Sequence, residues 1–419
     1  MITSDKNSLL RYAVKRSGNA VAYCALTIKA GTRYEGTYPE GIAHFIEHTL
    51  FKGTTHKSAR TITGYLDKLG GELNAFTTKE EIVLHATVLK EDIDKAADLL
   101  FELATCPTFP EAEIQTEKGV VIDEINSYKD SPSEDIYDVF EQKIFDGHPL
   151  SKLILGTTDS VKSIQCSDLR AYVQEKFIPE NMVFTLVADI EEEKMEKKVK
   201  RLIDKYFSTE HNIDSCLTAN KCISIACDDE NPRPFHRFQK TIDQENHQVN
   251  CVIGGYAPSI YDHENRIPAI LMGNILGGPS NNSILNTDLR EKHGWVYGVE
   301  CSYNQYSDCG LMTISFGCDE ENLTRCLRHI DSAINKLSTT LLSDSKLKEA
   351  KKQLLGQLAI SYDNGETLCL SMGKNLLTYG EIDTDGKMRH KIQDITAEEI
   401  KMAASTIFSK TNRSRLIYL

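Results

Sequence analysis

Two histidines and a glutamate within residues 44–48 form the most chemically suggestive pattern in this sequence. The five residues read His-Phe-Ile-Glu-His, so His44, Glu47 and His48 occupy positions i, i+3 and i+4. On an α-helix these positions share one face. Neutral imidazoles are good zinc ligands, and a carboxylate between them could act as the general base of a hydrolase. An ordinary helix face with two surface histidines is the alternative interpretation.

Residues 110–128 are predicted to form one long helix that carries two further carboxylates. Pro110 stands where a helix can begin, and apolar residues recur along the segment at helical spacing. Glu117 and Glu124 are seven positions apart, so they lie two turns apart along one line beside the apolar stripe. Two carboxylates next to a core favour a shared cation, because burying an unpaired charge is costly. A solvated row of glutamates on an amphipathic helix is the alternative.

Together the two segments resemble the pitrilysin and mitochondrial-processing-peptidase family of zinc peptidases, which carry the inverted motif H-x-x-E-H, in its single-chain bacterial type. The resemblance covers essentially the whole chain. It implies one Zn²⁺ per chain, held by His44, His48 and Glu124. It also implies Glu47 as the catalytic base, and Glu117 as a residue that orients the ligands from outside the coordination sphere.

The second half of the chain carries an arginine and a tyrosine seven positions apart, Arg290 and Tyr297. In the resembled family such a pair projects toward the zinc and takes part in catalysis. A tyrosine hydroxyl can donate to a developing oxyanion, and an arginine can hold a substrate carbonyl or carboxylate. A structural arginine on a surface helix and a tyrosine on a buried strand are the alternative.

Residues 70–77 read Gly-Gly-Glu-Leu-Asn-Ala-Phe-Thr and resemble the family strand that pairs with a peptide backbone beside the zinc. The resemblance implies Asn74, Ala75 and Phe76 as substrate-binding residues, since strand addition binds peptides through main-chain hydrogen bonds. A hairpin or edge strand without a ligand is the alternative. The remaining histidines have no ligand-type partner at helical spacing on a convincing helix, and they are interpreted as surface or core residues.

Composition narrows the class of protein. The chain has 419 residues, of which 40% are hydrophobic and 26% charged, as in an ordinary globular protein with two or more domains. The net charge of −13 opposes binding to nucleic acid. We find no apolar run near the roughly 18 residues of a membrane span and no secretory signal pattern. The 12 cysteines are scattered, so a disulfide framework is not expected. A bacterial-type cytoplasmic protein is the expectation.

The two halves of the sequence share an apolar pattern. Residues 109–114 match residues 342–347, and the same alignment carries Val121 onto Leu354. The chemically active residues are not kept: Glu124 falls on Gln357 in this alignment. The sequence therefore predicts a structural repeat whose second copy binds no metal.

A polar, turn-rich stretch separates the two copies and predicts the domain boundaries. We expect a catalytic lobe at residues 1–210, a linker at 211–236, and at 237–419 a metal-free homologous lobe that carries the Arg/Tyr pair. Each lobe is predicted as an α/β sandwich of the α+β class, a mostly antiparallel sheet with helices on one face. The resemblance implies two such lobes in a clamshell arrangement.

The resemblance also implies a function. It indicates a zinc-dependent endopeptidase that hydrolyses peptides or unfolded segments held between the lobes. Because one chain carries both the zinc motif and the Arg/Tyr pair, a homodimer is expected rather than a heterologous partner. A non-catalytic assembly subunit of the same fold is the alternative, since some relatives in the family serve that way after losing their ligands.

Overall fold

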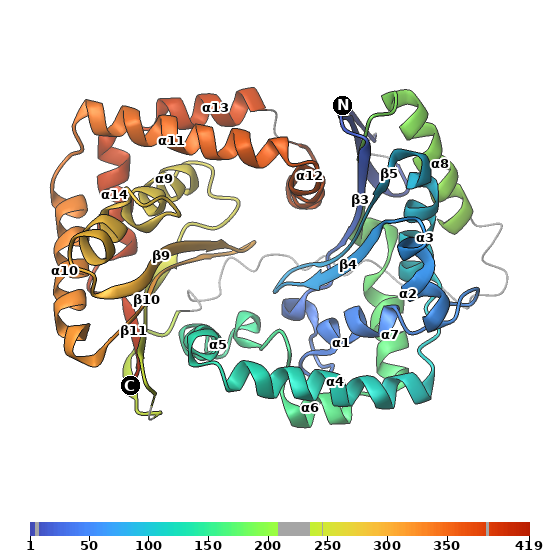
Figure 1. Cartoon of the computed structure of the whole chain (residues 1–419), viewed down its shortest axis with the longest axis horizontal. Coiled ribbons are helices and arrows are strands. Elements are labelled where there is room, and N and C mark those ends of the chain that lie inside the picture. The colour runs from blue at the N-terminus through green and yellow to red at the C-terminus, as the bar shows by residue number, and fades with distance from the viewer. Residues whose placement is uncertain (5–7, 208–234, 245, 383–384) are drawn as a thin grey trace. The chain divides into compact units, whose positions relative to one another are not determined.

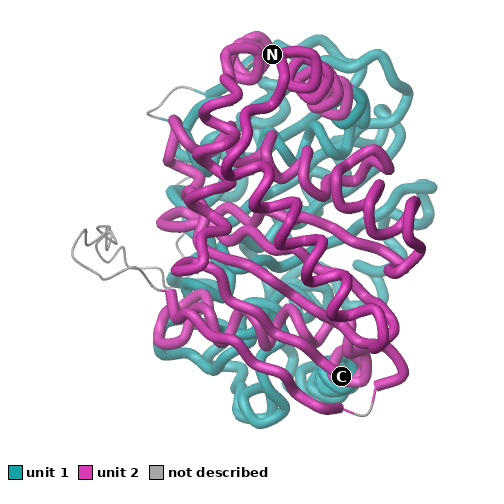
Figure 2. The backbone as a smooth tube through the Cα atoms, turned by 90° about the vertical axis from the view of Figure 1, so that its left-hand side faces the viewer, with its two compact units in different colours: residues 1–126, 152–225, 360–383 teal, residues 127–151, 226–359, 384–419 magenta. Residues whose placement is uncertain are grey.

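The computed structural model describes the chain except for residues 5–7, 208–234, 245 and 383–384 (Figure 1). Two mixed sheets are each covered by helices. The chain divides into two compact units, unit 1 and unit 2, which Figure 2 colours separately. This arrangement confirms the predicted α+β class with two lobes.

Unit 1 is built on a six-stranded sheet with the order β1-β2-β6-β3-β5-β4. Only β2 and β6 run parallel; the other neighbours are antiparallel. Its strands are β1 (Ile2–Thr3), β2 (Arg11–Arg16), β3 (Val21–Ile28), β4 (Glu72–Thr77), β5 (Ile82–Leu89) and β6 (Met182–Ala188). Its α-helices are α1 (Ile42–Leu50), α2 (Ala59–Asp67), α3 (Ile93–Thr105), α4 (Glu111–Lys129), α6 (Thr158–Ser163), α7 (Cys166–Lys176), α8 (Glu192–Phe207) and α12 (Gly365–Tyr379).

Unit 2 is built on a five-stranded sheet with the order β7-β11-β8-β10-β9, in which only β11 and β7 run parallel. Its strands are β7 (Gln239–Ile242), β8 (Val249–Ala257), β9 (Val296–Gln305), β10 (Gly310–Cys318) and β11 (Ser414–Tyr418). Its helices are α5 (Pro132–Ile144), α9 (Arg266–Gly277), the π-helix η5 (Asn286–Lys292), α10 (Glu320–Thr339), α11 (Asp344–Asp363), α13 (Asp385–Asp394) and α14 (Ala397–Ile407).

The two sheets have the same topology once β1 is set aside. Each has one parallel pair at one side and three antiparallel neighbours, and β4 and β9 form the corresponding edges. The helices follow the same order along the chain, so that α4 corresponds to α11 and the next helix, α5, corresponds to α12. The topology agrees with the repeat that the apolar pattern predicts.

Two corresponding helices, α5 and α12, are exchanged between the two halves of the sequence. Figure 1 shows α3 and α8 on one face of the first sheet and α12 beside β3 on the other. On α12, the buried residues Cys369, Met372 and Leu376 pack with Ala25 and Val187 of that sheet. In unit 2 the reciprocal place is taken by α5. Each sheet is thus covered on its second face by a helix from the other half of the sequence.

This exchange makes both units discontinuous in sequence. Unit 1 comprises Met1–Asn126, Lys152–Ile225 and Ile360–Asp383, and the intervening segments belong to unit 2. The boundaries of the two units therefore differ from the expected lobes at 1–210 and 237–419. The apolar residues of a helix show that one of its faces is buried, but they do not show which sheet covers that face. The expected linker at 211–236 lies, apart from its last two residues, outside the described residues.

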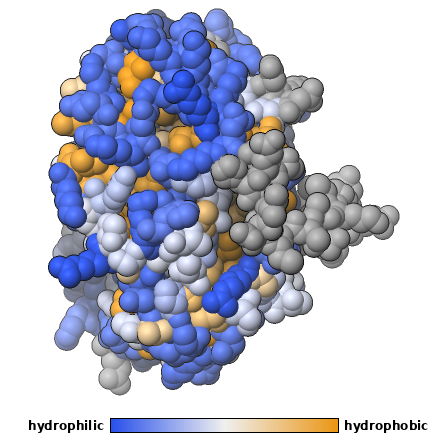
Figure 3. Space-filling model, turned by 90° about the vertical axis from the view of Figure 1, so that its right-hand side faces the viewer, coloured by the Kyte–Doolittle hydropathy of each residue, from blue (hydrophilic) through white to orange (hydrophobic). Residues whose placement is uncertain are grey.

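Among the described helices, none combines the length and the apolar character that crossing a membrane would need. The face of the molecule shown in Figure 3 is mainly hydrophilic, with apolar residues scattered between polar ones. Scattered apolar residues of this kind are normal on protein surfaces.

Helix α12 packs closely against β3 of unit 1, and a substitution can test this contact. A Cβ added to Gly373 would lie 2.5 Å from the Oγ1 of Thr27, a buried residue of β3. Overpacking costs about 1–3 kcal/mol, more than the roughly 1 kcal/mol of helix propensity that alanine gains. We expect Gly373→Ala to lower the free energy of unfolding measured in urea. Gly356→Ala, on α11 with nothing within 4 Å, should raise it; equal effects would contradict the tight packing.

Candidate metal centre

Helix α1, which carries the H-x-x-E-H motif, is fixed at its first turn. Gly41, directly before the helix, has a φ of 85°, and a Cβ there would lie 2.8 Å from the backbone of Gly156. One side-chain oxygen of the buried Glu35 accepts hydrogen bonds from the backbone N–H groups of Gly41 and Ala43, and burial raises the pKa of this carboxyl group to about 8. Helix N-termini favour such an acceptor because their first N–H groups lack partners. No motif or spacing in the sequence singled out Glu35.

Helix α4 runs as its spacing predicts. Its buried apolar residues Ile114, Val121 and Ile125 form one stripe, and Glu117 beside them is only 5% exposed. Glu124, two turns further along, is 34% exposed. The predicted line of two carboxylates is therefore present, with one buried end and one end open to solvent.

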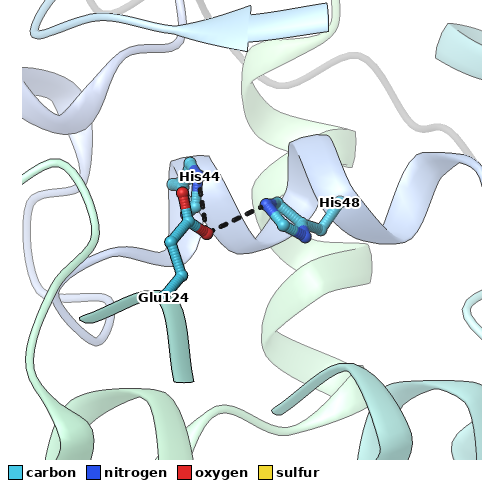
Figure 4. Close-up of side chains that lie close together, drawn as sticks. All are labelled: His44, His48 and Glu124. Atoms are coloured by element: carbon cyan, nitrogen blue, oxygen red, sulfur yellow. Dashed lines mark ion pairs between the residues drawn. The ribbon is translucent and has the colours of Figure 1, made fainter. Parts of the chain in front are cut away.

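The two helices bring three potential ligands together (Figure 4). One carboxylate oxygen of Glu124, Oε2, lies 3.8 Å from Nε2 of His44 and 3.5 Å from Nε2 of His48. Zinc bonds of about 2.0–2.2 Å in a tetrahedron put neighbouring ligand atoms roughly 3.4 Å apart. The donor atoms and their spacing therefore fit a zinc ion held by two imidazoles and a carboxylate.

Glu117 decides which nitrogen of His48 is available to a metal. Its Oε1 lies 2.9 Å from Nδ1 of His48, and its Oε2 lies 2.6 Å from Nζ of Lys52. An ionised carboxylate only accepts hydrogen bonds, so Nδ1 of His48 must carry the proton. The lone pair is then on Nε2, the atom that faces Glu124. Lys52, four positions after His48, is a further part of the site that the motif alone did not reveal.

His44 is held in the neutral form that a metal ligand requires. The side chain is 8% exposed, and its ring centroid is 4.6 Å from that of His48. Burial, together with the neighbouring His48, lowers the pKa of His44 from 6.5 to about 3. At neutral pH the imidazole therefore keeps a free lone pair for coordination.

Glu47 lies on the same helix with its carboxylate bound to strand β4. The hydroxyl of Thr77 donates to Oε2 of Glu47 at 2.6 Å. Burial raises the pKa of Glu47, while the Thr77 hydrogen bond opposes that rise. A carboxylate whose pKa is raised toward neutrality is a better proton acceptor in catalysis. Thr77 ends the segment that the sequence singled out, but its contact with Glu47 was not predicted.

The predicted substrate strand is an edge strand of the first sheet. Asn74, Ala75 and Phe76 lie on β4, which pairs with β5 alone among the described strands. The side chain of Phe76 is 37% exposed, and its ring centroid lies 5.9 Å from that of His85. One backbone edge of β4 is thus left for another strand, as peptide binding by strand addition requires.

Arg290 and Tyr297 belong to unit 2. Arg290 is exposed on η5, and Tyr297 is 68% exposed on the edge strand β9, with its hydroxyl 3.3 Å from Oδ1 of Asp319. Of the alternative, an arginine on a surface helix agrees with the structure, whereas a tyrosine on a buried strand does not. Their approach to the histidines of unit 1 stays a prediction.

The corresponding position in unit 2 holds a pair of amides. Gln357 of α11, which aligns with Glu124, accepts a hydrogen bond from Asn274 of α9 at 2.7 Å and donates one to Ser280. Uncharged amides link the two elements at the place where unit 1 presents metal-ligating atoms.

Comparisons with known proteins agree with this arrangement. Residues 11–158 match the family described as insulinase (peptidase family M16), and residues 163–354 match the M16 peptidase inactive domain. The chain is 30% identical to an uncharacterized zinc protease, YmxG, of Bacillus subtilis, over 93% of this chain and 91% of that protein. A probable mitochondrial-processing peptidase subunit beta of Arabidopsis thaliana is 26% identical, over 94% and 74% of the two chains.

The fold is also found in solved structures. A protease from Helicobacter pylori superposes with a TM-score of 0.86 at 18% identity, covering 100% of this chain and 98% of the other. The matches to the two M16 family descriptions and the 30% identity with YmxG show that the chain belongs to the M16 peptidase family, the family of insulinase and pitrilysin.

The pKa of His44 leads to a prediction about the metal-free protein. Because the pKa is lower in the folded state than in the unfolded state, the contribution to stability is complete above pH 6.5 and is lost as the pH falls toward 3. In chelator, His44→Gln should therefore flatten the fall of the unfolding free energy across this range, by up to about 1.4 kcal/mol per pH unit. The exposed His56→Gln is the matched control; identical slopes for both variants would contradict the burial of His44.

Proposed function

We propose that this protein is a zinc-dependent endopeptidase that hydrolyses peptides or unfolded segments, with one Zn²⁺ held by His44, His48 and Glu124. The observation that carries the proposal is the convergence of two Nε2 atoms on one oxygen of Glu124. Glu117 supports it by fixing the tautomer of His48. Membership of a peptidase family adds a precedent for this chemistry.

Zinc in this centre would supply Lewis acidity, which polarises a carbonyl and makes water more acidic. Glu47 accepts the proton of the attacking water and delivers it to the leaving amine. Its position on the same face as the ligands, and its raised pKa, suit both transfers. Thr77 holds one oxygen of Glu47, so that the other is directed to the proton.

The substrate backbone binds along the free edge of β4, at Asn74, Ala75 and Phe76. Pairing through main-chain groups selects for extended chains and tolerates many side chains. A folded protein cannot present such a strand without unfolding locally, which favours peptides and unfolded segments. Tyr297 donates a hydrogen bond to the developing oxyanion, and Arg290 orients a substrate carbonyl or carboxylate.

A non-catalytic assembly subunit remains the second candidate of the same fold. The second half of this chain illustrates how such a form arises, since Gln357 replaces a ligand there. In the first half the three ligands of the proposed centre and the base Glu47 are all present, which favours the enzyme. The homodimer and the cytoplasmic location stay predictions; sedimentation of the purified protein would test the first of them.

The role of Glu47 is open to a direct test. Glu47→Gln keeps the size of the side chain but removes the proton acceptor, so turnover of a fluorogenic peptide should fall by about 10²–10⁴-fold while the zinc content stays at the wild-type level. Glu124→Gln is the control that should lose the zinc of this centre as well as activity. Full turnover by Glu47→Gln would rule out the proposed base.

The hydrogen bond from Thr77 should be visible in the pH profile. It stabilises the ionised carboxylate, so Thr77→Val should raise the pKa of Glu47 and move the acidic limb of kcat/KM to higher pH. Thr77→Ser keeps the hydroxyl and should retain the wild-type profile. If the acidic limb does not move in Thr77→Val, then Glu47 does not carry out the rate-determining proton transfer.

A further inference from the structure

Three potential metal ligands also converge within unit 2. Asp288 lies on η5, His293 follows directly after that helix, and His329 lies on α10. Their ligand atoms all lie within 4.8 Å of one another. Oδ2 of Asp288 is 2.7 Å from Nδ1 of His329, and Oδ1 is 3.7 Å from Nε2 of His293. Helical spacing did not reveal this cluster, because His329 comes from an element distant in sequence.

One nitrogen in the cluster lacks a partner. Nε2 of His293 is buried and makes no hydrogen bond. The imidazole is stacked on Trp295, with ring centroids 4.1 Å apart and planes 11° apart, so its orientation toward Asp288 is fixed by packing. A buried polar atom without a partner costs free energy, which a ligand on that atom would recover.

The cluster has the same donor types as the centre in unit 1. Both combine two imidazoles with one carboxylate, and both place a carboxylate oxygen 3.5–3.8 Å from at least one imidazole nitrogen. They differ at the second histidine, where Asp288 and His329 are already hydrogen-bonded. The side chains of the cluster are 27–29% exposed, so the cluster lies close to the surface of the unit.

We propose that Asp288, His293 and His329 bind a second divalent ion of the zinc class. Two imidazoles with one carboxylate favour Zn²⁺, Co²⁺, Ni²⁺ or Cu²⁺, whereas Mg²⁺ and Ca²⁺ prefer oxygen ligands. To bind, the Asp288 carboxylate must turn until its distance from Nδ1 of His329 rises from 2.7 Å to roughly 3.4 Å. His329 must also carry its proton on Nε2. The site is therefore weaker than the centre in unit 1.

An ion at this position would join η5 to α10. The ligands flank Arg290, and the turn that holds His293 and Trp295 leads directly into β9 and Tyr297. Binding would thus restrain the segment that carries the proposed Arg/Tyr pair. This consequence rests on the proposed function, but the binding of the ion does not.

The chain has a single tryptophan, Trp295, and it lies beside this cluster. Its fluorescence can therefore be used to follow an ion that binds there. Trp295 stacks on His293, and its ring centroid lies 4.9 Å from that of His329. Bound Co²⁺ quenches a neighbouring indole because its open d shell accepts the excitation at short range. We would titrate Co²⁺ into metal-free protein that carries His44→Gln and His48→Gln, which removes the first centre, and follow the tryptophan emission.

The expected result is saturable quenching that Zn²⁺ reverses by competition and that Mg²⁺ does not produce. Asp288→Asn and His329→Gln in the same background should weaken the apparent Co²⁺ affinity by at least about 10-fold, since loss of even an outer partner of a metal ligand typically costs 10–100-fold. Glu291→Gln removes an exposed carboxylate from the same π-helix and should leave the affinity unchanged.

Quenching that does not saturate, or that is equal in Asp288→Asn, His329→Gln and Glu291→Gln, would overturn the proposal. Zinc content gives a second measurement that needs no variant of the cluster. The protein with His44→Gln and His48→Gln should retain one zinc per chain after gel filtration at micromolar free zinc, and no zinc would also overturn the proposal. Neither readout depends on peptide turnover, so failure here is distinct from failure of the proposed peptidase.

Discussion

The hydrogen bond between Glu117 and His48 is the interaction on which the candidate centre depends. It fixes the proton on one ring nitrogen and leaves the other facing Glu124. For this bond to form, Glu117 must be buried as a charge beside the apolar stripe of α4, and Lys52 offsets that cost. The contact joins α1 to α4, and Glu35 holds the first turn of α1 through Gly41 and Ala43.

The two units of the duplicated fold show that the residues that maintain the sheet and its helices differ from the residues that could bind a metal. Both units keep the same strand order, and α4 of unit 1 corresponds to α11 of unit 2. The apolar stripe is buried along α4, whereas in α11 Leu354 is buried and Leu347 and Leu358 are partly buried. At the position of Glu124, unit 2 has Gln357, whose amide joins α9 through Asn274. An amide can hold two elements together by hydrogen bonds, but it is a poor ligand for zinc. The fold therefore survives the loss of the metal-ligating atoms.

Local periodicity made part of the structure predictable. The spacing of His44, Glu47 and His48 on one helix, and of Glu117 and Glu124 on another, follows from 3.6 residues per turn. α4 matches its predicted range within a residue at each end. The supporting residues were harder to find. Thr77 comes from an edge strand and Glu35 from a loop. Periodicity along the sequence does not predict which distant side chains such residues will contact.

The sequence by itself determined the secondary structure around the centre and the repeat, because these depend on residue type and on spacing along one element. It placed His44 and His48 on one helix face by spacing, whereas Glu124 as the third ligand was implied by the resemblance to a family. Tertiary structure alone decided which sheet each of α5 and α12 covers, since an apolar helix face is satisfied equally by either sheet. It alone also brought Asp288, His293 and His329 together. Their proximity depends on packing between elements far apart in the chain, where sequence spacing carries no distance information.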